Sequence, residues 1–253
     1  MKHVKYYICA FLLLMANAPI VSAQEDPGAE EYFGTADMPD MVKWLPAPPE
    51  AGSPDFVADV MRYMWGKEQR QDSVRAAMAV RDAKFSLQTI MNEFSEPFGL
   101  QISPDGTPEI YKLLLDATTT CYNVCVLPKK HYMRRRPFMY FNEHTLIPSK
   151  EAEHRTDGSY PSGHTILGWS SALLLMEINP EAADTLLARG YMFGESRVIA
   201  GYHWQSDVTA SYIAASVAYA KLHTNEKFVE QMAKAKAEFR EKKYGEVPKK
   251  RRK

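Results

Sequence analysis

The sequence predicts an all-α protein, folded as a single-domain helical bundle. From residue 56 onward, apolar side chains recur at intervals of three and four residues, which is the spacing of one face of a helix. Two such sets are Val57, Val60, Met61 and Met64, and then Ile110, Leu113, Leu114 and Ala117. The alternation of apolar and polar residues that marks a half-buried strand is scarce. Helices are therefore expected throughout the core.

Composition and charge exclude several classes of protein. Of the 253 residues, 45% are hydrophobic and 11% are aromatic, which is typical of a globular domain and not of a disordered or fibrous chain. The 31 Lys and Arg residues are balanced by 31 Asp and Glu residues, so the formal net charge gives no reason to expect nucleic acid or an anionic membrane as a partner. Any charge with a function must be local.

The N-terminal residues 1–23 have the pattern of a cleaved secretory signal peptide. Lys2 and Lys5 form a basic start, residues 6–18 are an apolar run, and the small residues 21–23 offer a cleavage site. The mature chain is then expected to begin near Gln24, in the periplasm or outside the cell.

A membrane anchor is the alternative interpretation of that segment, but Asn17 and Pro19 interrupt its apolar run. Farther along the chain, the longest apolar stretches are residues 165–178 and 208–222. Both are shorter than the roughly 20 residues that a membrane-spanning helix needs. We expect both to be core helices and the mature protein to have no membrane segment.

The mature chain divides into three parts. Residues 24–55 contain six prolines and are expected to form an extended arm that packs across the surface. Residues 56–233 should form the all-α domain, because about 230 residues suit one sizeable core better than two. Residues 234–253 alternate in charge and end in a basic run, which predicts a solvated helix and a frayed tail.

Cysteine usage excludes a disulfide-rich scaffold, because only Cys121 and Cys125 lie in the body of the chain. They are one helical turn apart, at which spacing the Cα atoms come within the roughly 5.5–6 Å favoured by a disulfide. Export would supply an oxidising compartment. A Cys121–Cys125 bond and two small buried thiols are both compatible with the sequence.

A first candidate motif is basic. Lys129 and Arg136 lie seven positions apart in the run LPKKHYMRRRPF, and on one helix they would project from nearly the same face. Two cations on one face suit an oxyanion, although a basic helical turn is more often just solvated. Pro128, directly before Lys129, is expected to break or restart the helix there.

A second motif, GSYPSGH over residues 158–164, leads directly into an apolar helix. Ser162 and Gly163 then fall at the helix N-terminus, where unpaired N–H groups and the positive end of the helix dipole favour an anion. The glycine would let that anion approach the backbone. A plain Ser cap followed by a buried histidine, His164, would give the same pattern.

The third motif joins Ser196 and Arg197 to His203 and Asp207. A carboxylate four residues after a histidine can hold one ring nitrogen and leave the lone pair of the other free to act as a nucleophile or base. The alternative is that Ser206 or Asp207 only caps the following helix. The three motifs together supply cations, an anion-binding helix end and two histidines, which phosphoryl transfer without a metal requires.

At this point the sequence resembles the bacterial class A non-specific acid phosphatases. They are soluble members of the type 2 phosphatidic acid phosphatase superfamily, which also contains the vanadium haloperoxidases. The family signature is K-x6-RP, PSGH and SR-x5-H-x3-D, and all eleven of its positions are present, as Lys129, Arg136, Pro137, Pro161, Ser162, Gly163, His164, Ser196, Arg197, His203 and Asp207. The likeness extends over most of the chain up to about Leu222.

The resemblance implies that the protein hydrolyses small phosphomonoesters without a metal or other cofactor, and that it forms homo-oligomers, most simply dimers. His203 would attack phosphorus and become a phosphohistidine, Asp207 would orient its ring, and His164 would protonate the leaving alcohol. Five residues would bind the equatorial phosphoryl oxygens: Lys129, Arg136, Ser162, Gly163 and Arg197.

Two other functions share the same motifs. A vanadate-dependent haloperoxidase would hold vanadate in this site, and a non-catalytic phosphate-binding protein would use only its cations. The retention of both His164 and His203 argues against simple binding, which needs neither a nucleophile nor an acid. The histidines outside the signature are expected to have surface or packing roles, and they are His131, His144, His154 and His223.

Overall fold

The computed structural model describes residues 28–245, and within this range every regular element is helical, which confirms the predicted all-α class. The α-helices are α1 (Pro54–Gln69), α2 (Ser73–Arg81), α3 (Leu87–Phe98), α4 (Pro108–Tyr122), α5 (Val126–Tyr132), α6 (Pro137–Phe141), α7 (Gly163–Ile178), α8 (Ala183–Ala200), α9 (Gln205–Leu222) and α10 (Glu226–Tyr244). Short 3-10 helices lie at Thr35–Asp37, Asn123–Cys125, Pro148–Lys150, Ala152–His154 and Pro180–Ala182. The expected signal peptide, residues 1–23, and the basic end, residues 246–253, lie outside the described residues.

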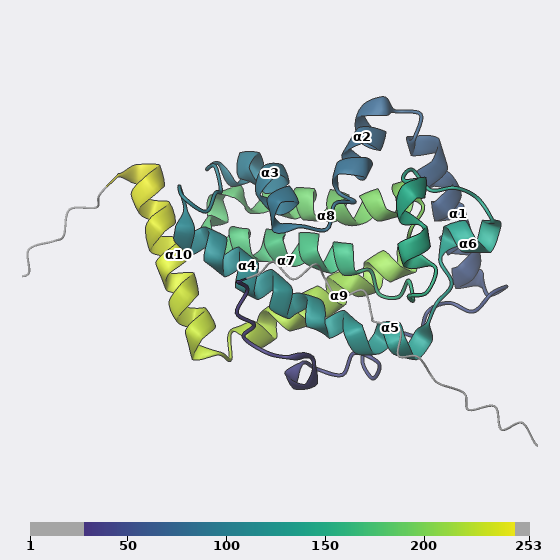
Figure 1. Cartoon of the computed structure of the whole chain (residues 1–253), viewed down its shortest axis with the longest axis horizontal. Coiled ribbons are helices and arrows are strands. Elements are labelled where there is room, and N and C mark those ends of the chain that lie inside the picture. The colour runs from purple at the N-terminus through teal and green to yellow at the C-terminus, as the bar shows by residue number, and fades with distance from the viewer. Residues whose placement is uncertain (1–27, 246–253) are drawn as a thin grey trace, which may run out of the picture.

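Helix α7 occupies the centre of the bundle and packs against α4, α8 and α9 (Figure 1). α7 carries apolar side chains all around its axis, as expected of a buried helix, and most of its residues are buried. Close approach to α8 depends on Gly190, since a Cβ there would lie 2.7 Å from the Cβ of Ala172. Gly190 thereby lets α7 and α8 pack closely at the middle of α7.

The N-terminal arm packs along the bundle from residue 28 to Ser53, which caps α1. Three of its apolar side chains, Met38, Met41 and Leu45, are buried in the main core. The Pro46 carbonyl accepts a hydrogen bond from the hydroxyl of Tyr160, just before the PSGH motif. The arm is therefore tied to the segment that leads into α7.

The C-terminal helix differs from the expected solvated tail. α10 runs unbroken across residue 234 and buries Phe228, Met232, Ala235 and Phe239. It packs against α4 and α7, at the end of the bundle opposite α5 and α6 (Figure 1). The buried positions follow a regular spacing of four, three and four residues, and the many Lys and Glu residues between them obscured that pattern in the sequence.

None of the helices within residues 28–245 is both long enough and apolar enough to cross a lipid bilayer. The stretches around α7 and α9 are core helices, as their length and their scattered polar residues predicted.

Candidate active site

Lys129 and Arg136 converge, but not on one helical face as the spacing suggested. α5 ends at Tyr132, Met133 has a positive φ of 42°, and Arg136 is the N-cap of the separate helix α6. The two cations meet because the chain turns between them. Lys129 Nζ lies 2.9 Å and Arg136 Nη2 lies 3.4 Å from the carbonyl oxygen of Gly158.

Pro128 explains why α5 is a separate helix. It is the third residue of α5, within the first turn, where the missing N–H of a proline has no partner to lose. A 3-10 turn at Asn123–Cys125 separates α5 from α4. The restart of the helix that Pro128 predicted is therefore present, and it sets the direction in which Lys129 projects.

Arg136 is 1% exposed and is surrounded by hydrogen-bond acceptors. It donates to the carboxylate of Asp157 at 2.8 Å and to the carbonyl of Tyr202 at 3.1 Å. Its Nη1 also lies 3.1 Å from Nε2 of His203. Although burial opposes ionisation, the neighbouring ring of His154 and the charge of Arg136 lower the pKa of Asp157. Asp157 is thus an anionic anchor for this arginine.

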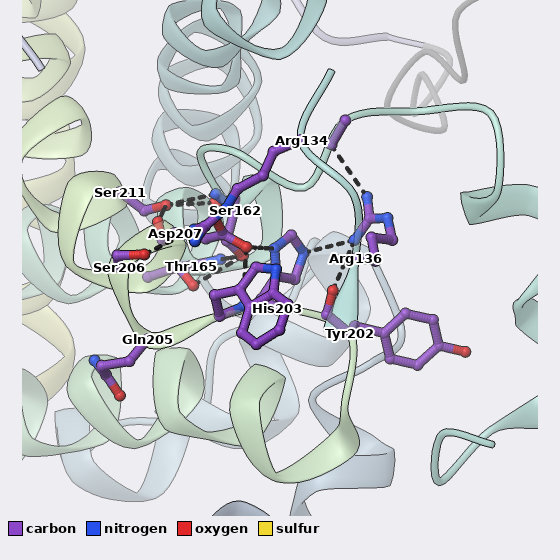
Figure 2. A network of polar contacts seen from close by, with 12 residues as sticks. Arg134, Arg136, Ser162, Thr165, Tyr202, His203, Gln205, Ser206, Asp207 and Ser211 are labelled. Carbon is purple, nitrogen blue, oxygen red and sulfur yellow. Dashed lines mark hydrogen bonds and ion pairs between the residues drawn. The ribbon is translucent and has the colours of Figure 1, made fainter. Parts of the chain in front are cut away.

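Figure 2 shows the ring of His203 between Asp207 on one side and Arg136 on the other. Nδ1 of His203 lies 3.3 Å from Oδ2 of Asp207, so Nε2 carries the lone pair in the neutral ring. Burial, followed by the charges of Arg136 and Lys129, holds the pKa of His203 well below its usual value. The ring is neutral, as a nucleophile requires, and the lone pair on Nε2 faces the guanidinium of Arg136.

Asp207 combines the two roles that the sequence left open. Its Oδ2 accepts a hydrogen bond from the backbone N–H of Trp204 at 2.9 Å, which caps α9, and the same oxygen faces His203. One carboxylate oxygen of Asp207 therefore both caps α9 and orients the ring of His203. It fixes the start of α9 relative to the ring.

Arg134 contacts Asp207 and was not singled out in the sequence. Its guanidinium lies 2.5 Å from Oδ1 of Asp207 (Figure 2). It also lies 2.7 Å from Oδ2 of Asp59 on α1. Asp59 also accepts hydrogen bonds from the backbone N–H and the hydroxyl of Ser206. Arg134 and Arg136 alternate in the run of three arginines, but nothing in that run distinguishes the residue that holds Asp207.

The PSGH motif forms the start of α7. Ser162 Oγ accepts a hydrogen bond from the backbone N–H of Thr165, so this serine caps the helix as the plainer interpretation expected. Its own N–H lies 2.7 Å from Oγ of Ser211, which donates to the Asp207 carbonyl at 2.7 Å. A Cβ on Gly163 would lie 2.5 Å from the ring of Tyr122. The motif is therefore fixed against both α9 and α4.

His164 follows in the first turn of α7 and is almost fully buried. Its Nε2 lies 3.0 Å from the carbonyl oxygen of Ala83, and its ring meets that of Phe85 edge-on at 4.8 Å. Burial and the charge of Arg197 lower the pKa of His164 well below its usual value. The link between α2 and α3 thus covers this histidine.

Arg197 is 1% exposed, and its Nε and Nη1 have no hydrogen-bond partner among the described residues. Burial lowers the pKa of its guanidinium to about 10, so it stays charged at neutral pH. The backbone carbonyl of Arg197 accepts a hydrogen bond from the N–H of His203 at 3.3 Å. A buried cation with free donors beside a neutral histidine is suited to an anionic ligand.

Cys121 and Cys125 are both free and buried in the structure, so the disulfide that their spacing allows is not formed there. A 3-10 helix at Asn123–Cys125 ends the regular helix between them. Burial raises the pKa of Cys121 to about 12 and that of Cys125 to about 11. Neither thiol is reactive in this state.

The histidines outside the signature differ in their surroundings. His131, His144 and His223 are exposed, whereas His154 is half-buried beside the site. The ring of His154 packs edge-on against Tyr202 at 5.2 Å, and its Nδ1 lies 3.5 Å from Asp157. Within residues 28–245, no three His, Cys, Asp or Glu side chains gather as a metal site.

Comparison with known proteins agrees with this geometry. The family model described as the PAP2 superfamily matches residues 111–229. The non-specific acid phosphatase of Providencia stuartii is 44% identical over 209 residues, which cover 82% of this chain and 84% of the relative. That of Salmonella typhimurium is 41% identical over 79% of this chain and 80% of the relative. An acid phosphatase of Zymomonas mobilis is 34% identical over 85% of this chain and 80% of the relative. The chain belongs to the bacterial non-specific acid phosphatases of the PAP2 superfamily.

Proposed function

We propose that this enzyme hydrolyses small phosphomonoesters through a phosphohistidine formed on His203. One observation carries the proposal: the buried guanidinium of Arg197 has two donors with no partner within residues 28–245, next to a histidine that is neutral and held by a carboxylate. A dianionic phosphoryl group would satisfy those donors and place phosphorus near Nε2. The names of the relatives point to the same class of substrate.

In the proposed reaction, Nε2 of His203 attacks phosphorus, and the bond to the leaving alcohol breaks as the new N–P bond forms. Asp207 stabilises the charge that develops on the ring through its contact with Nδ1. His164 gives a proton to the leaving oxygen and then activates the water that releases phosphate.

The cations are proposed to replace a metal. Lys129, Arg136 and Arg197 carry three positive charges in buried or half-buried positions, which would balance the equatorial oxygens as charge builds in the transition state. The N-terminus of α7 would add the backbone N–H of Gly163. We expect chelators to leave activity unchanged and vanadate, which mimics the trigonal-bipyramidal transition state, to inhibit.

The site of action and the assembly are also part of the proposal. Residues 1–23 support export to the periplasm or beyond the cell, since they have the basic, apolar and small-residue regions of a signal peptide. The dimer implied by the family resemblance stays a prediction, which the mass of the purified protein in solution would test.

The decisive experiment is trapping of the intermediate. Brief incubation with 32P-labelled substrate should label the denatured wild-type protein, and His203→Ala should lose both label and turnover. His164→Ala should still label with a substrate that has a good leaving group, and then release phosphate slowly. Label of undiminished strength in His203→Ala would refute the assignment of the nucleophile.

The same preparation separates the other two functions. Phosphate release from 4-nitrophenyl phosphate and from a panel of nucleotides, with and without chelator, tests hydrolysis directly. Bromide oxidation in the presence of vanadate and peroxide would indicate a haloperoxidase. Saturable phosphate binding without turnover of any ester would indicate a binding protein.

A further inference from the structure

The link between α2 and α3, residues 82–86, connects two motifs that are far apart in the sequence. Asp82 at its start contacts Ser196, which directly precedes Arg197. Ala83, the next residue, contacts His164. Two adjacent residues of the link therefore contact both motifs: Asp82 contacts the residue before Arg197, and Ala83 contacts His164.

Asp82 is completely buried and is held by three donors. The hydroxyl of Ser196 lies 2.6 Å and Nη1 of Arg189 lies 3.3 Å from its Oδ2, and Nη2 of Arg189 binds its Oδ1. Nη1 of Arg75 donates to the oxygen of Ser196 at 2.8 Å, so the hydroxyl proton points away from Arg75. Two acceptors are within its reach, and Oδ2 of Asp82 at 2.6 Å is nearer than the Met192 carbonyl at 2.9 Å. A buried carboxylate with this many directed donors fixes the position of its own backbone.

The position of that backbone matters because of what Ala83 does. Its carbonyl oxygen lies 3.0 Å from Nε2 of His164 and can only accept, so Nε2 must carry hydrogen. Nδ1 is then the nitrogen that remains to exchange a proton with the leaving group. A ring whose Nε2–H is not held could take the other tautomer or rotate, and it would lose that alignment.

We propose that Asp82 is a positioning residue for the general acid: its contacts with Ser196 and Arg189 hold the Ala83 carbonyl against His164 and so fix which ring nitrogen serves the leaving group. The inference rests on the proposed role of His164 in proton transfer. It assigns to the family motif an acidic partner that lies 114 positions before Ser196 in the sequence.

The test uses leaving groups of different basicity. 4-Nitrophenolate leaves without help, whereas a simple alkoxide needs a proton from the acid. In Asp82→Ala we expect kcat/KM to fall by about 10- to 100-fold for an alkyl phosphate, as for the loss of one hydrogen bond to a charged group, and by less than about threefold for 4-nitrophenyl phosphate. Asp82→Asn, which keeps an acceptor oxygen, should lie between wild type and Asp82→Ala.

Glu93→Gln is the matched control. Glu93 also binds Arg189, at 2.9 Å, but it contacts neither Ser196 nor the link that carries Ala83. This carboxylate-to-amide change should lower kcat/KM equally for both esters or not at all. If Asp82→Ala fails to fold, Asp82→Asn and Ser196→Ala, which removes a single contact to the carboxylate, should show the same selective loss on a smaller scale.

A second measurement does not depend on turnover. In 15N-labelled wild-type protein at neutral pH, His164 should give the nitrogen shifts of the Nε2–H tautomer, with the signal assigned by its absence in His164→Gln. Asp82→Ala should show a mixture of tautomers. Equal losses for both esters together with an unchanged tautomer would overturn the inference. Failure of wild-type His203 to label would overturn the proposed function instead, and the tautomer measurement would still stand.

Discussion

His203 illustrates how a buried site can keep a histidine neutral in acid. Burial and the neighbouring charges of Arg136 and Lys129 depress its pKa, and the contact with Asp207 is the opposing influence. An ordinary histidine would be half protonated near pH 6.5 and would lose its lone pair below that. In this site His203, the proposed nucleophile, stays neutral at mildly acidic pH.

The first prediction is a bell-shaped profile of kcat/KM with its maximum on the acidic side of neutral. The acidic limb reports protonation of His203 and lies below pH 6.5, because the pKa of His203 is lowered. The other limb reports loss of the proton from His164, whose pKa is lowered as well, so activity declines before neutral pH is passed. Rates with one substrate at constant ionic strength from pH 4 to pH 9 test this. A profile that is flat or rises up to pH 9 would contradict the paired-histidine mechanism.

Arg134 is the second residue whose role can be tested. It neutralises the side of Asp207 that faces away from His203, so its removal should leave more of that negative charge acting on the ring. Arg134→Gln should therefore raise the pKa of His203 and move the acidic limb of kcat/KM to higher pH. Because Arg134 also serves Asp59, the loss of one partner of a buried ion pair should lower the free energy of unfolding by about 3–5 kcal/mol.

Arg135→Gln is the control for Arg134. Arg135 is the next residue, it is exposed, and it donates only to the carbonyl of Met139. Its loss should change the free energy of unfolding by no more than about 0.5 kcal/mol and leave the pH profile in place. Identical profiles for the two variants would mean that Arg134 does not tune His203.

Among the elements, α10 is the one whose role differs most from expectation. The third prediction is that Phe239→Ala lowers the free energy of unfolding by about 3–5 kcal/mol, because it empties a buried site against Phe98, whose ring centre is 4.9 Å away. Since α10 and His164 lie at different ends of α7, kcat/KM at 25 °C should stay unchanged. Urea unfolding and steady-state rates measure the two effects.

Val229→Ala on the same helix is the matched control, since its side chain is 49% exposed. It should change stability by at most about 0.5 kcal/mol. If Phe239→Ala were equally harmless, α10 would be a detachable tail as the charge pattern first indicated.

Elements defined by local patterns could be predicted from the sequence, and elements without such a pattern could not. The helices and the signature residues were predictable because their patterns are local: three or four residues for a helix face, and short fixed spacings for His203 with Asp207. The turn at Met133 was not predictable, since no sequence pattern indicates that a residue other than glycine will adopt a positive φ there. Arg136 therefore lies beside Lys129 because the chain turns at Met133, and not because both residues share one helix.

The acidic residues Asp59 and Asp82 could not be predicted from the sequence, for a different reason. Asp59 and Arg134 are 75 positions apart, and Asp82 and Ser196 are 114 apart, so only the packing of α1 and α2 against the rest brings each pair together. An isolated aspartate in the sequence carries no signal of such a distant partner. Short motifs identified the signature residues, whereas only the fold shows which distant residues hold them in place.

At the scale of the whole molecule, a formal net charge of zero conceals a local excess of positive charge. Lys129, Arg136 and Arg197 are gathered at one end of the bundle, and two donors of Arg197 have no partner in the described part of the chain. Burial of a cation without a partner is unfavourable. The two donors of Arg197 without hydrogen-bond partners therefore lower stability, and an anionic ligand would supply those partners.

The last prediction follows from that imbalance. Inorganic phosphate at about 100 times its Kd should stabilise the native state by about 2.7 kcal/mol, which raises Tm by roughly 5–10 °C for a chain of this size. Arg197→Gln should lose most of this shift.

Without phosphate, Arg197→Gln should melt at or above the wild-type temperature, because the change removes a buried and partly unsatisfied charge. Arg155→Gln, which changes an exposed arginine, should keep the full shift. Scanning calorimetry with and without phosphate, at matched ionic strength, measures all three proteins. If Arg197→Gln lowered Tm in the absence of phosphate and still responded fully to it, Arg197 would be a structural residue and the anion would bind elsewhere.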